Sequence, residues 1–281
     1  MRPHHYDDER AIEAINPQYN ARLVRRVDQT SDLATFWVRF DGEPTPFDAG
    51  QYMTIGVYAD GKLWQRPYSV ASPPEEASTE GYEFYVRLVP IMRFTTLLWR
   101  LPIGHEMRMI GPKGRFLLEP DDDRTHLFVS TGTGIAPFIS MMRQLALQGR
   151  PRRIVMLNGC SYVHELGYRE LLESWQRDRT YPLTYVPTVS RPDDPRNAGW
   201  TGHTGRAEGV VRDVVHDLRL RPEKTVVYIC GNPDMILNVE SLLLHAGFPE
   251  FHVKKELYWP KGKVATMPDG SPAPSGAPVA S

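Results

Sequence analysis

The segment RPYS, residues 66–69, places an arginine, a tyrosine and a serine within four positions. It ends an alternating run, KLWQ, whose pattern predicts a β-strand. In a strand, Arg66 and Tyr68 point to one face and Ser69 to the other, while the backbone amides stay available. The combination indicates a ligand that needs a cation, an aromatic plane and a hydroxyl at one place.

A glycine-rich loop, STGTGIAP at residues 130–137, follows a buried-type strand and precedes a helical pattern. Gly132 and Gly134 would let backbone amides approach a phosphate, and the start of the following helix favours an anion. Pro137 is compatible with that position because the first N–H groups of a helix lack intrahelical partners. The motif alone also fits a tight strand-to-helix turn, so its interpretation depends on the residues around it.

Three further segments are expected at the same edge of a sheet. TVSR places Ser190 and Arg191 there, the following loop GHTGR carries Arg206, and YICGNPDM, read as the last strand and its loop, places Cys230 there. An open parallel sheet binds ligands at the carboxyl ends of its strands. Two arginines beside a dinucleotide could clamp an additional phosphate through charge-assisted hydrogen bonds, although either one alone would be an ordinary surface charge.

The elements that must position these residues fall into two groups. Residues 19–119 read as short strands between turns, with one helix over 95–102, which is typical of an antiparallel Greek-key β-barrel or a sandwich. After residue 124, strands and helices alternate, which predicts a doubly wound parallel α/β sheet. We therefore predict a two-domain chain with a loosely attached lead-in (1–17), a barrel domain (18–120), an α/β domain (121–259) and a disordered tail (260–281).

Composition limits the possible functions. Hydrophobic residues make up 41% and charged residues 24% of the 281, and the net charge of -1 gives no attraction to nucleic acid or anionic membranes. Because neither a signal peptide nor a membrane-spanning run is present, a cytoplasmic protein is expected. Cys160 and Cys230 are too few for an iron–sulfur cluster or a cysteine-only zinc site, and His4-His5 lacks a third ligand, so we expect no metal.

Four motifs in order resemble the ferredoxin–NADP reductase family: RPYS (66–69), GTGIAP (132–137), CGNPDM (230–235) and ELYW (256–259). The resemblance covers residues 20–259. It implies an FAD-binding antiparallel barrel followed by a nucleotide-binding α/β domain. The ligand of RPYS would then be a flavin dinucleotide.

On the flavin side, the resemblance implies that Arg66 neutralises the FAD pyrophosphate and that Tyr68 packs against the flavin and ribityl. Ser69 would lie near flavin N5, which accepts hydride and needs a polar neighbour. Pro67 completes the motif.

Other positions match the family's flavin contacts less directly. Tyr85 and Arg87 match residues that line the adenosine and flavin side, and Thr95 and Thr96 match the turn that binds the pyrophosphate. Met92 stands where the family usually has glycine, so the phosphate geometry of this turn departs from the family pattern.

On the nicotinamide side, the resemblance implies that Thr133 and Gly134 contact the dinucleotide and that Cys230 lies beside the nicotinamide. Glu256 would relay or position a proton, and Tyr258 would stack on the flavin and move aside when the nicotinamide arrives. The other residues expected to bind cofactor are Pro137, Ser190, Asp234 and Trp259.

The choice between NADPH and NADH depends on arginines. NADP-specific members carry an arginine seven residues before the tyrosine of a DLxY-like segment, which here is ELGY (165–168), and that position holds Ser161. Arg191 and Arg206 match the other two ligands of the 2′-phosphate. We therefore favour NADPH over NADH.

The resemblance implies that hydride passes from NADPH C4 to flavin N5 and that single electrons then pass to ferredoxin or flavodoxin, or the reverse. A monomer is expected. Two alternatives stay open: an NADH-dependent oxygenase reductase or flavin reductase without a cluster, and a non-catalytic FAD electron-transfer subunit of a larger complex. The intact GTGIAP and CGNPDM motifs speak against the second.

Overall fold

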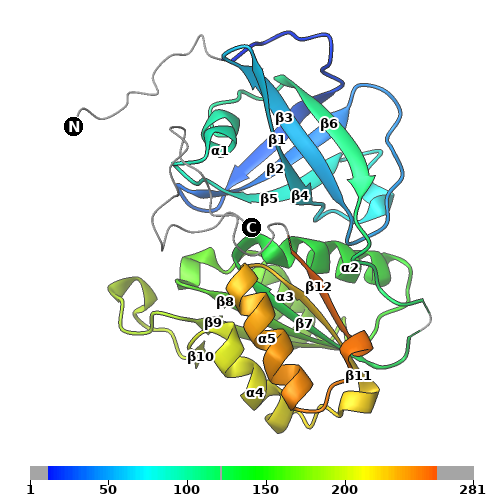
Figure 1. Cartoon of the computed structure of the whole chain (residues 1–281), viewed down its shortest axis with the longest axis vertical. Helices are drawn as coiled ribbons and strands as arrows, with labels where there is room; N and C mark the ends of the chain where they lie inside the picture. The colour runs from blue at the N-terminus through cyan, green and yellow to red at the C-terminus, as the bar shows by residue number, and fades with distance from the viewer. Residues whose placement is uncertain (1–11, 121, 258–281) are drawn as a thin grey trace.

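Two six-stranded sheets organise the chain, one in each half (Figure 1). The computed structural model describes residues 12–120 and 122–257. The first sheet is antiparallel, with the strand order β4-β3-β6-β1-β2-β5. Its strands are β1 (Ala21–Asp28), β2 (Leu33–Phe40), β3 (Tyr52–Ala59), β4 (Lys62–Ser69), β5 (Tyr82–Arg87) and β6 (Glu106–Lys113).

The two outer strands of this sheet, β4 and β5, approach each other and close it into a barrel. An isolated antiparallel bridge joins Val70 to Phe84 directly after the RPYS segment. Alternate residues point inward, and Phe36, Met53 and Ile55 are fully buried in the core. Helix α1 (Arg93–Leu98) packs against β3 and β4. The predicted antiparallel barrel and its single α-helix are confirmed, although the helix starts two residues earlier and ends four residues earlier than expected.

Two parts of the first half differ from the sequence expectation. Strand β6 was not recognised, because Gly111 and Pro112 interrupt its pattern and methionine is not a typical strand residue. The described part of the lead-in is attached to the barrel, since Ile12 bridges Ala59 and the amide of Glu13 donates to the carbonyl of Tyr58 at 2.9 Å.

The second sheet is parallel, with the order β10-β9-β8-β7-β11-β12. Helices α2 (Ala136–Leu147) and α3 (Arg169–Arg177) cover one face, while α4 (Ala207–Asp217) and α5 (Pro233–His245) cover the other. Apolar residues on both faces of the strands make this possible: Phe128 packs toward α2, and its neighbours Leu127 and Val129 pack toward α4 and α5. The doubly wound α/β domain is confirmed. The strands are β7 (Thr125–Thr131), β8 (Ile154–Cys160), β9 (Leu183–Val189), β10 (His203–Thr204), β11 (Thr225–Cys230) and β12 (Val253–Glu256).

One expectation about this sheet is wrong. The strand that ends in YIC, β11, is not the last, because β12 follows it and pairs with it in parallel. Strand β12 was not predicted from the sequence because it contains Lys254 and Lys255. Charged residues are tolerated on an edge strand, but they do not indicate a strand.

The two halves share a core and several polar contacts. Tyr85 and Phe116 of the first half pack with Phe138 of the second. Glu83 on β5 is 3% exposed, accepts a hydrogen bond from the Tyr168 hydroxyl at 2.8 Å and pairs with Arg143 on α2 at 2.6 Å. The domains are therefore held in one relative orientation by buried contacts.

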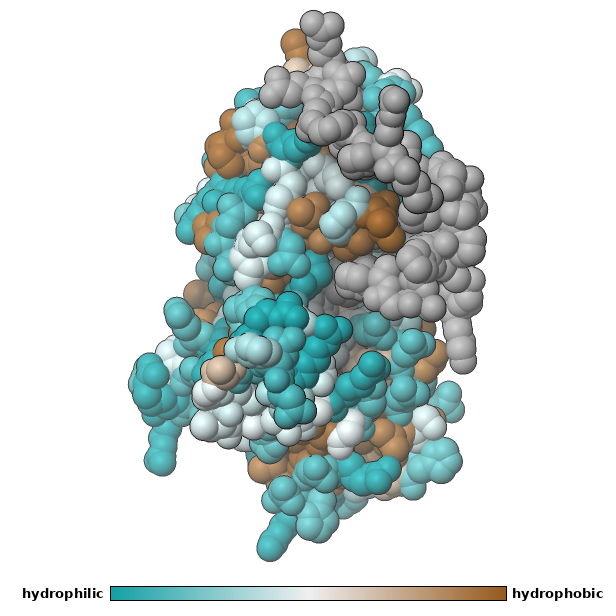
Figure 2. Space-filling model, turned by 90° about the vertical axis from the view of Figure 1, so that its left-hand side faces the viewer, coloured by the Kyte–Doolittle hydropathy of each residue, from teal (hydrophilic) through white to brown (hydrophobic). Residues whose placement is uncertain are grey.

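Figure 2 shows the hydropathy of one face of the molecule. Hydrophilic residues predominate there and hydrophobic ones form separate groups. Isolated groups of this kind are ordinary on protein surfaces. Among residues 12–120 and 122–257, no helix is both long and apolar enough to cross a membrane.

Candidate functional site

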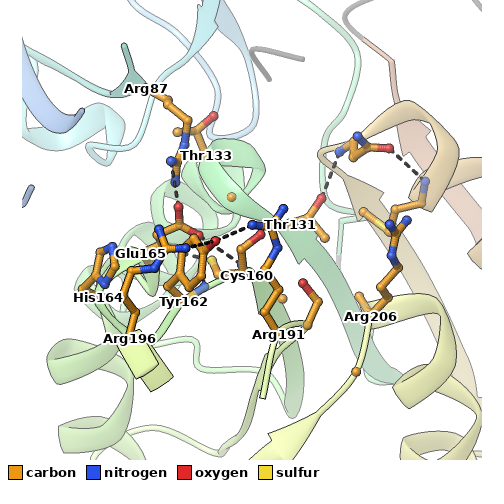
Figure 3. Close-up of a pocket in the computed structure, with 18 of the residues that line it drawn as sticks. Arg87, Thr131, Thr133, Cys160, Tyr162, His164, Glu165, Arg191, Arg196 and Arg206 are labelled. Carbon is orange, nitrogen blue, oxygen red and sulfur yellow. Dashed lines mark hydrogen bonds and ion pairs between the residues drawn. The ribbon is translucent and has the colours of Figure 1, made fainter. Parts of the chain in front are cut away.

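A pocket of about 720 Å³ opens at the carboxyl edge of the parallel sheet (Figure 3). Its floor consists of the ends of β7, β8 and β9 and the residues that follow them. The barrel supplies part of its wall through Ser31, Asp32 and Arg87. The sequence-predicted residues that line it are Arg87, Thr133, Ser190, Arg191 and Arg206.

The GTGIAP and CGNPDM motifs meet beside this pocket. A Cβ on Gly134 would lie 2.5 Å from the Cα of Gly231 and 2.6 Å from the carbonyl oxygen of Cys230. The hydroxyl of Thr131 accepts a hydrogen bond from the amide of Asn232 at 2.9 Å, and the Asn232 side chain in turn caps α5. Because no side chain fits between the two loops, glycine is required at 134.

The remaining predicted residues near these loops have structural positions. Pro137 is buried in the first turn of α2. Asp234 stands in the first turn of α5 and its amide donates to Asn232, while its neighbours Asn232 and Met235 line the pocket.

Cationic side chains line the pocket. Arg191, Arg196 and Arg206 all line it. Arg191 has no carboxylate within ion-pair distance among the described residues, and Arg206 has only a long contact with Glu208, at 3.8 Å. Such a cluster can bind an anion with more than one negative charge.

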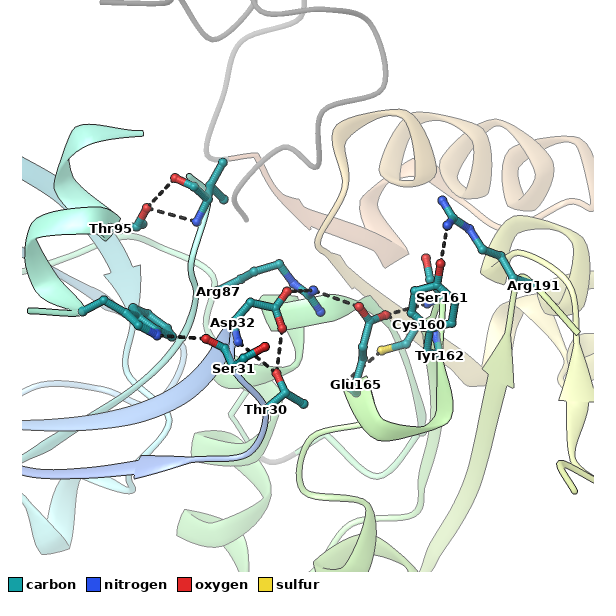
Figure 4. A network of polar contacts seen from close by, with 12 residues as sticks. Thr30, Ser31, Asp32, Arg87, Thr95, Cys160, Ser161, Tyr162, Glu165 and Arg191 are labelled. Carbon is teal, nitrogen blue, oxygen red and sulfur yellow. Dashed lines mark hydrogen bonds and ion pairs between the residues drawn. The ribbon is translucent and has the colours of Figure 1, made fainter. Parts of the chain in front are cut away.

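A polar network connects the barrel to the pocket (Figure 4). The guanidinium of Arg87 pairs with Asp32 at 2.9 Å and with Glu165 at 2.8 Å. The second carboxylate oxygen of Glu165 accepts from the amides of Ser161 at 3.0 Å and Tyr162 at 3.2 Å. Glu165 is therefore bound on both sides, and it holds the loop after β8 against the barrel.

Cys160 lies within this network. Its thiol donates to the backbone carbonyl of Glu165 at 3.3 Å. Burial, reinforced by the nearby Glu165 carboxylate, raises the pKa of Cys160 to about 12. The thiol therefore stays protonated at neutral pH.

The residues predicted for the reaction centre lie at the junction of the two domains. Cys230 is fully buried, and the sheet register places Ser130 and Glu256 on either side of it. A Cβ on Gly114, at the end of β6, would lie 3.1 Å from the Tyr52 ring and 3.4 Å from Oε1 of Glu256. Tyr52 is paired with Ser69 across β3 and β4. The chain fold thus brings Ser69, Glu256 and Cys230 to one region.

The two predicted flavin motifs are also neighbours. The Tyr68 ring lies 5.9 Å from that of Phe94, at the start of α1. Burial raises the pKa of Tyr68 far above its ordinary value, and the positive charge of Arg66 opposes the shift. An arginine and a buried tyrosine two residues apart fit a ligand with an anionic and a planar part, as FAD has.

The two threonines of the RFTT turn support the backbone. The Thr95 hydroxyl donates to the carbonyl of Val89 at 2.9 Å and accepts from the amide of Val89 at 3.1 Å, and the Thr96 hydroxyl donates to Arg93 at 2.8 Å. Their side chains therefore shape the turn that the sequence assigns to the pyrophosphate.

Two residues predicted for the adenosine and flavin side contact the second domain. Arg87 lines the pocket at the carboxyl edge of the parallel sheet, because its side chain reaches across the domain boundary to Glu165. Tyr85 is 2% exposed and packs against the Tyr168 ring of the second domain at 5.1 Å, so its side chain belongs to the interdomain core. Tyr258, Trp259 and the tail lie outside the described residues.

Sequence reasoning missed several residues of the pocket. Tyr162 is the second residue after β8, as Arg191 is after β9, so the rule that used strand ends to select Arg191 could have found it. Asp32, Glu165 and Arg196 carry no such signal, because only the folding of loops and the approach of the barrel bring them to the pocket.

Comparisons with known proteins agree with this geometry. Residues 20–117 match the oxidoreductase FAD-binding domain family, and residues 128–241 match the oxidoreductase NAD-binding domain family. Reductase component 1 of terephthalate 1,2-dioxygenase from a Comamonas species is 30% identical over 263 residues, which are 92% of this chain and 72% of that relative. Ferredoxin–NADP reductase B from Sorangium cellulosum is 31% identical over 225 residues, which are 78% of this chain and 88% of that relative.

A solved structure has the same fold. A ferredoxin NADP+ reductase from Neisseria gonorrhoeae, with bound FAD and NADP, aligns with a TM-score of 0.74 at 23% identity and covers 87% of this chain and 100% of its own. The two domain matches occur in the order of the barrel and the α/β sheet. The chain therefore belongs to the ferredoxin–NADP reductase family of FAD- and NAD(P)-binding oxidoreductases.

Proposed function

We propose that this protein is an FAD-dependent reductase that transfers electrons between NADPH and a small carrier protein, ferredoxin or flavodoxin. One observation supports this most strongly. Ser69 from the barrel region and Cys230 and Glu256 from the parallel sheet approach one junction, beside a pocket lined by arginines. A reductase of this kind needs a flavin and a dinucleotide to meet at one place.

We assign different roles in cofactor binding or proton transfer to the predicted site residues. Arg66 would neutralise the FAD pyrophosphate and Tyr68 would pack on the flavin, while Gly134 would contact the nicotinamide dinucleotide and Cys230 would lie beside the nicotinamide. When bound, FAD supplies the ability to accept an electron pair as hydride and to release electrons singly. Glu256 would hold or move a proton at its carboxylate, and Arg191 and Arg206 would bind the 2′-phosphate.

Anaerobic stopped-flow mixing of the FAD-loaded protein with NADPH or NADH tests the proposal. We expect bleaching of the flavin absorbance by both, with a lower half-saturating concentration for NADPH. Electron delivery is then measured by adding oxidised ferredoxin or flavodoxin to the reduced protein. Failure to retain FAD, or retention without bleaching by either nucleotide, would contradict the proposal.

A second candidate is an NADH-dependent reductase component of an oxygenase. The similarity to the terephthalate dioxygenase reductase supports it. Preferential bleaching by NADH, together with electron delivery to an oxygenase component and none to ferredoxin or flavodoxin, would select this function instead.

We also propose that the chain divides at residues 120 and 121 and acts as a monomer in the cytoplasm. The change from antiparallel to parallel sheet between Lys113 and Thr125 supports the division. Light scattering of the FAD-loaded protein tests the oligomeric state.

A further inference from the structure

The loop between β9 and β10 folds back onto the loop after β8. Asn197 is 3% exposed and joins the two loops. Its side chain accepts from the amide of Val163 at 2.8 Å and donates to the carbonyls of Ser161 at 2.9 Å and Arg191 at 2.8 Å. These bonds place the residue before it, Arg196, against Tyr162 at the rim of the pocket.

Arg196 is held in place from two sides. Its guanidinium carbon lies 3.6 Å from the centroid of the Tyr162 ring, and Nη2 donates to the Tyr162 hydroxyl at 2.5 Å (Figure 3). Nε and Nη2 also donate to the two carboxylate oxygens of Asp194, at 2.9 and 2.8 Å. An arginine ordered in advance loses less conformational entropy when it binds an anion.

One edge of this guanidinium stays available. Nη1 of Arg196 has no hydrogen-bond partner within the described chain, and the side chain is 54% exposed. Arg191 lies beside it and also donates to the Tyr162 hydroxyl. The Tyr162 hydroxyl thus holds two guanidinium groups at the same end of the pocket.

We propose that Arg196 is a specificity-determining residue that binds the 2′-phosphate of NADP(H). This deepens the proposed function and rests on it. A phosphomonoester carries up to two negative charges and three acceptor oxygens, so it gains from a third arginine in addition to Arg191 and Arg206. Ser161, in the same loop as Tyr162, offers no charge for this purpose. The fold-back of residues 191–197 supplies a cation from a different segment.

Calorimetric titration of the FAD-loaded protein with 2′,5′-ADP and with 5′-AMP isolates this contact, because the two probes differ only in the 2′-phosphate. Arg196→Ala should weaken 2′,5′-ADP binding about tenfold and change 5′-AMP binding less than twofold. Arg196→Lys should lie between, since it keeps the charge and loses the fork geometry. Arg177→Ala is the matched control, because Arg177 is also exposed and paired with a neighbouring aspartate, Asp178, but does not line the pocket.

Removing Arg196 also uncovers Asp194, whose charge could repel a phosphate. The double variant Arg196→Ala/Asp194→Asn removes that charge as well. Persistence of the loss in the double variant supports direct binding by Arg196, whereas full recovery overturns it. Melting temperatures of the variants, expected within a few degrees of the wild type, check that the fold is kept.

Other outcomes separate the inference from the function on which it rests. If Arg191→Ala weakens 2′,5′-ADP binding and Arg196→Ala does not, Arg196 is not a ligand and the reductase assignment stands. If the wild type binds both probes equally, 2′-phosphate recognition itself is overturned. If the wild type binds neither probe and is not bleached by NADPH or NADH, the proposed function fails first.

Discussion

Arg66 shows how much one residue can imply when its neighbours are known. Within the RPYS segment, its charge opposes the rise in the pKa of Tyr68, and α1 places the Phe94 ring 5.9 Å from the Tyr68 ring. The sequence placed these residue types together, but the contact with α1 depends on the closure of the barrel. The environment of Arg66 therefore depends both on its own sequence motif and on the tertiary packing of α1.

The prediction for Arg66 concerns FAD affinity. Arg66→Ala should weaken FAD binding by about 1.5–3 kcal/mol, because a charge-assisted contact to the pyrophosphate is lost. Equilibrium dialysis or flavin fluorescence on refilling the apoprotein measures the change. Arg108→Ala, which removes a partly buried arginine of β6 that donates to the Gln18 carbonyl, serves as the control. Equal FAD affinity of wild type and Arg66→Ala would remove Arg66 from the site.

His126 is a second residue with a measurable consequence. It is 0% exposed at the start of β7, where Nδ1 contacts the Arg124 carbonyl at 2.9 Å and Nε2 contacts Arg152 at 3.2 Å. Burial, with Arg152 acting in the same direction, lowers the pKa of His126 to about 4 although Asp122 opposes the shift. Between pH 6.5 and about 4, His126 therefore binds a proton in the unfolded chain but not in the folded protein.

Stability should consequently fall with pH in that window. On the order of 3 kcal/mol of unfolding free energy due to His126 should be present above pH 6.5 and lost as the pH falls to about 4. Urea unfolding at several pH values measures it. His126→Gln should flatten the decline in part, because burial also lowers the pKa of His105, whereas His216→Gln, at an exposed position, should not. An unchanged slope in His126→Gln would contradict the assignment.

At the scale of elements, the two loops that follow β7 and β11 act as one unit. Their sequences predict glycine-rich turns at a sheet edge, and the structure adds that Gly134 and Gly231 touch. That contact could not be predicted from either motif alone, because it depends on β7 and β11 being neighbours in the sheet.

A methyl group at Gly134 should separate these loops. Gly134→Ala places a Cβ 2.5 Å from the Cα of Gly231. The backbone of one loop must move to make room for it. We expect at least tenfold weaker binding of NADPH with FAD content unchanged. Gly209→Ala is the control, since nothing lies within 4 Å of a Cβ there and alanine favours the helix α4. Wild-type NADPH binding by Gly134→Ala would show that the close approach is not needed.

The elements that sequence reasoning found are those with strong periodicity. Strands such as β7, buried on both faces, and amphipathic helices such as α4 follow from the order of apolar residues. Edge strand β12 and the methionine-rich β6 do not, because their pairing partners and not their residue types stabilise them. The same holds for Arg87 and Arg196, whose roles depend on distant segments.

The proposed electron transfer requires the two domains to keep their relative orientation. Buried charged groups at the domain interface help to fix this orientation. Glu83 from the barrel is bound by Arg143 and Tyr168 of the second domain, and Ser140 of α2 donates to the Ser72 carbonyl at 2.7 Å. These contacts cross the interface beside the apolar cluster that contains Phe116 and Phe138. Domain orientation is thus linked to groups that cannot lose a partner without cost.

The last prediction asks whether the ion pair between Glu83 and Arg143 contributes to the stability of the protein, to the relative orientation of its domains, or to both. Glu83→Ala leaves Arg143, whose side chain is 24% exposed, without its carboxylate, and should lower the free energy of unfolding by about 3 kcal/mol. The double variant Glu83→Leu/Arg143→Met replaces the ion pair by apolar groups and should recover most of that loss. Denaturant unfolding measures both, and stopped-flow reduction by NADPH reports whether the recovered variant still brings the two half-sites together. If the double variant is stable but is reduced at least tenfold more slowly, the ion pair sets domain orientation. If the double variant is stable and is reduced at the wild-type rate, the apolar contacts are enough to set the domain orientation. The ion pair then serves only to neutralise the two charges of Glu83 and Arg143.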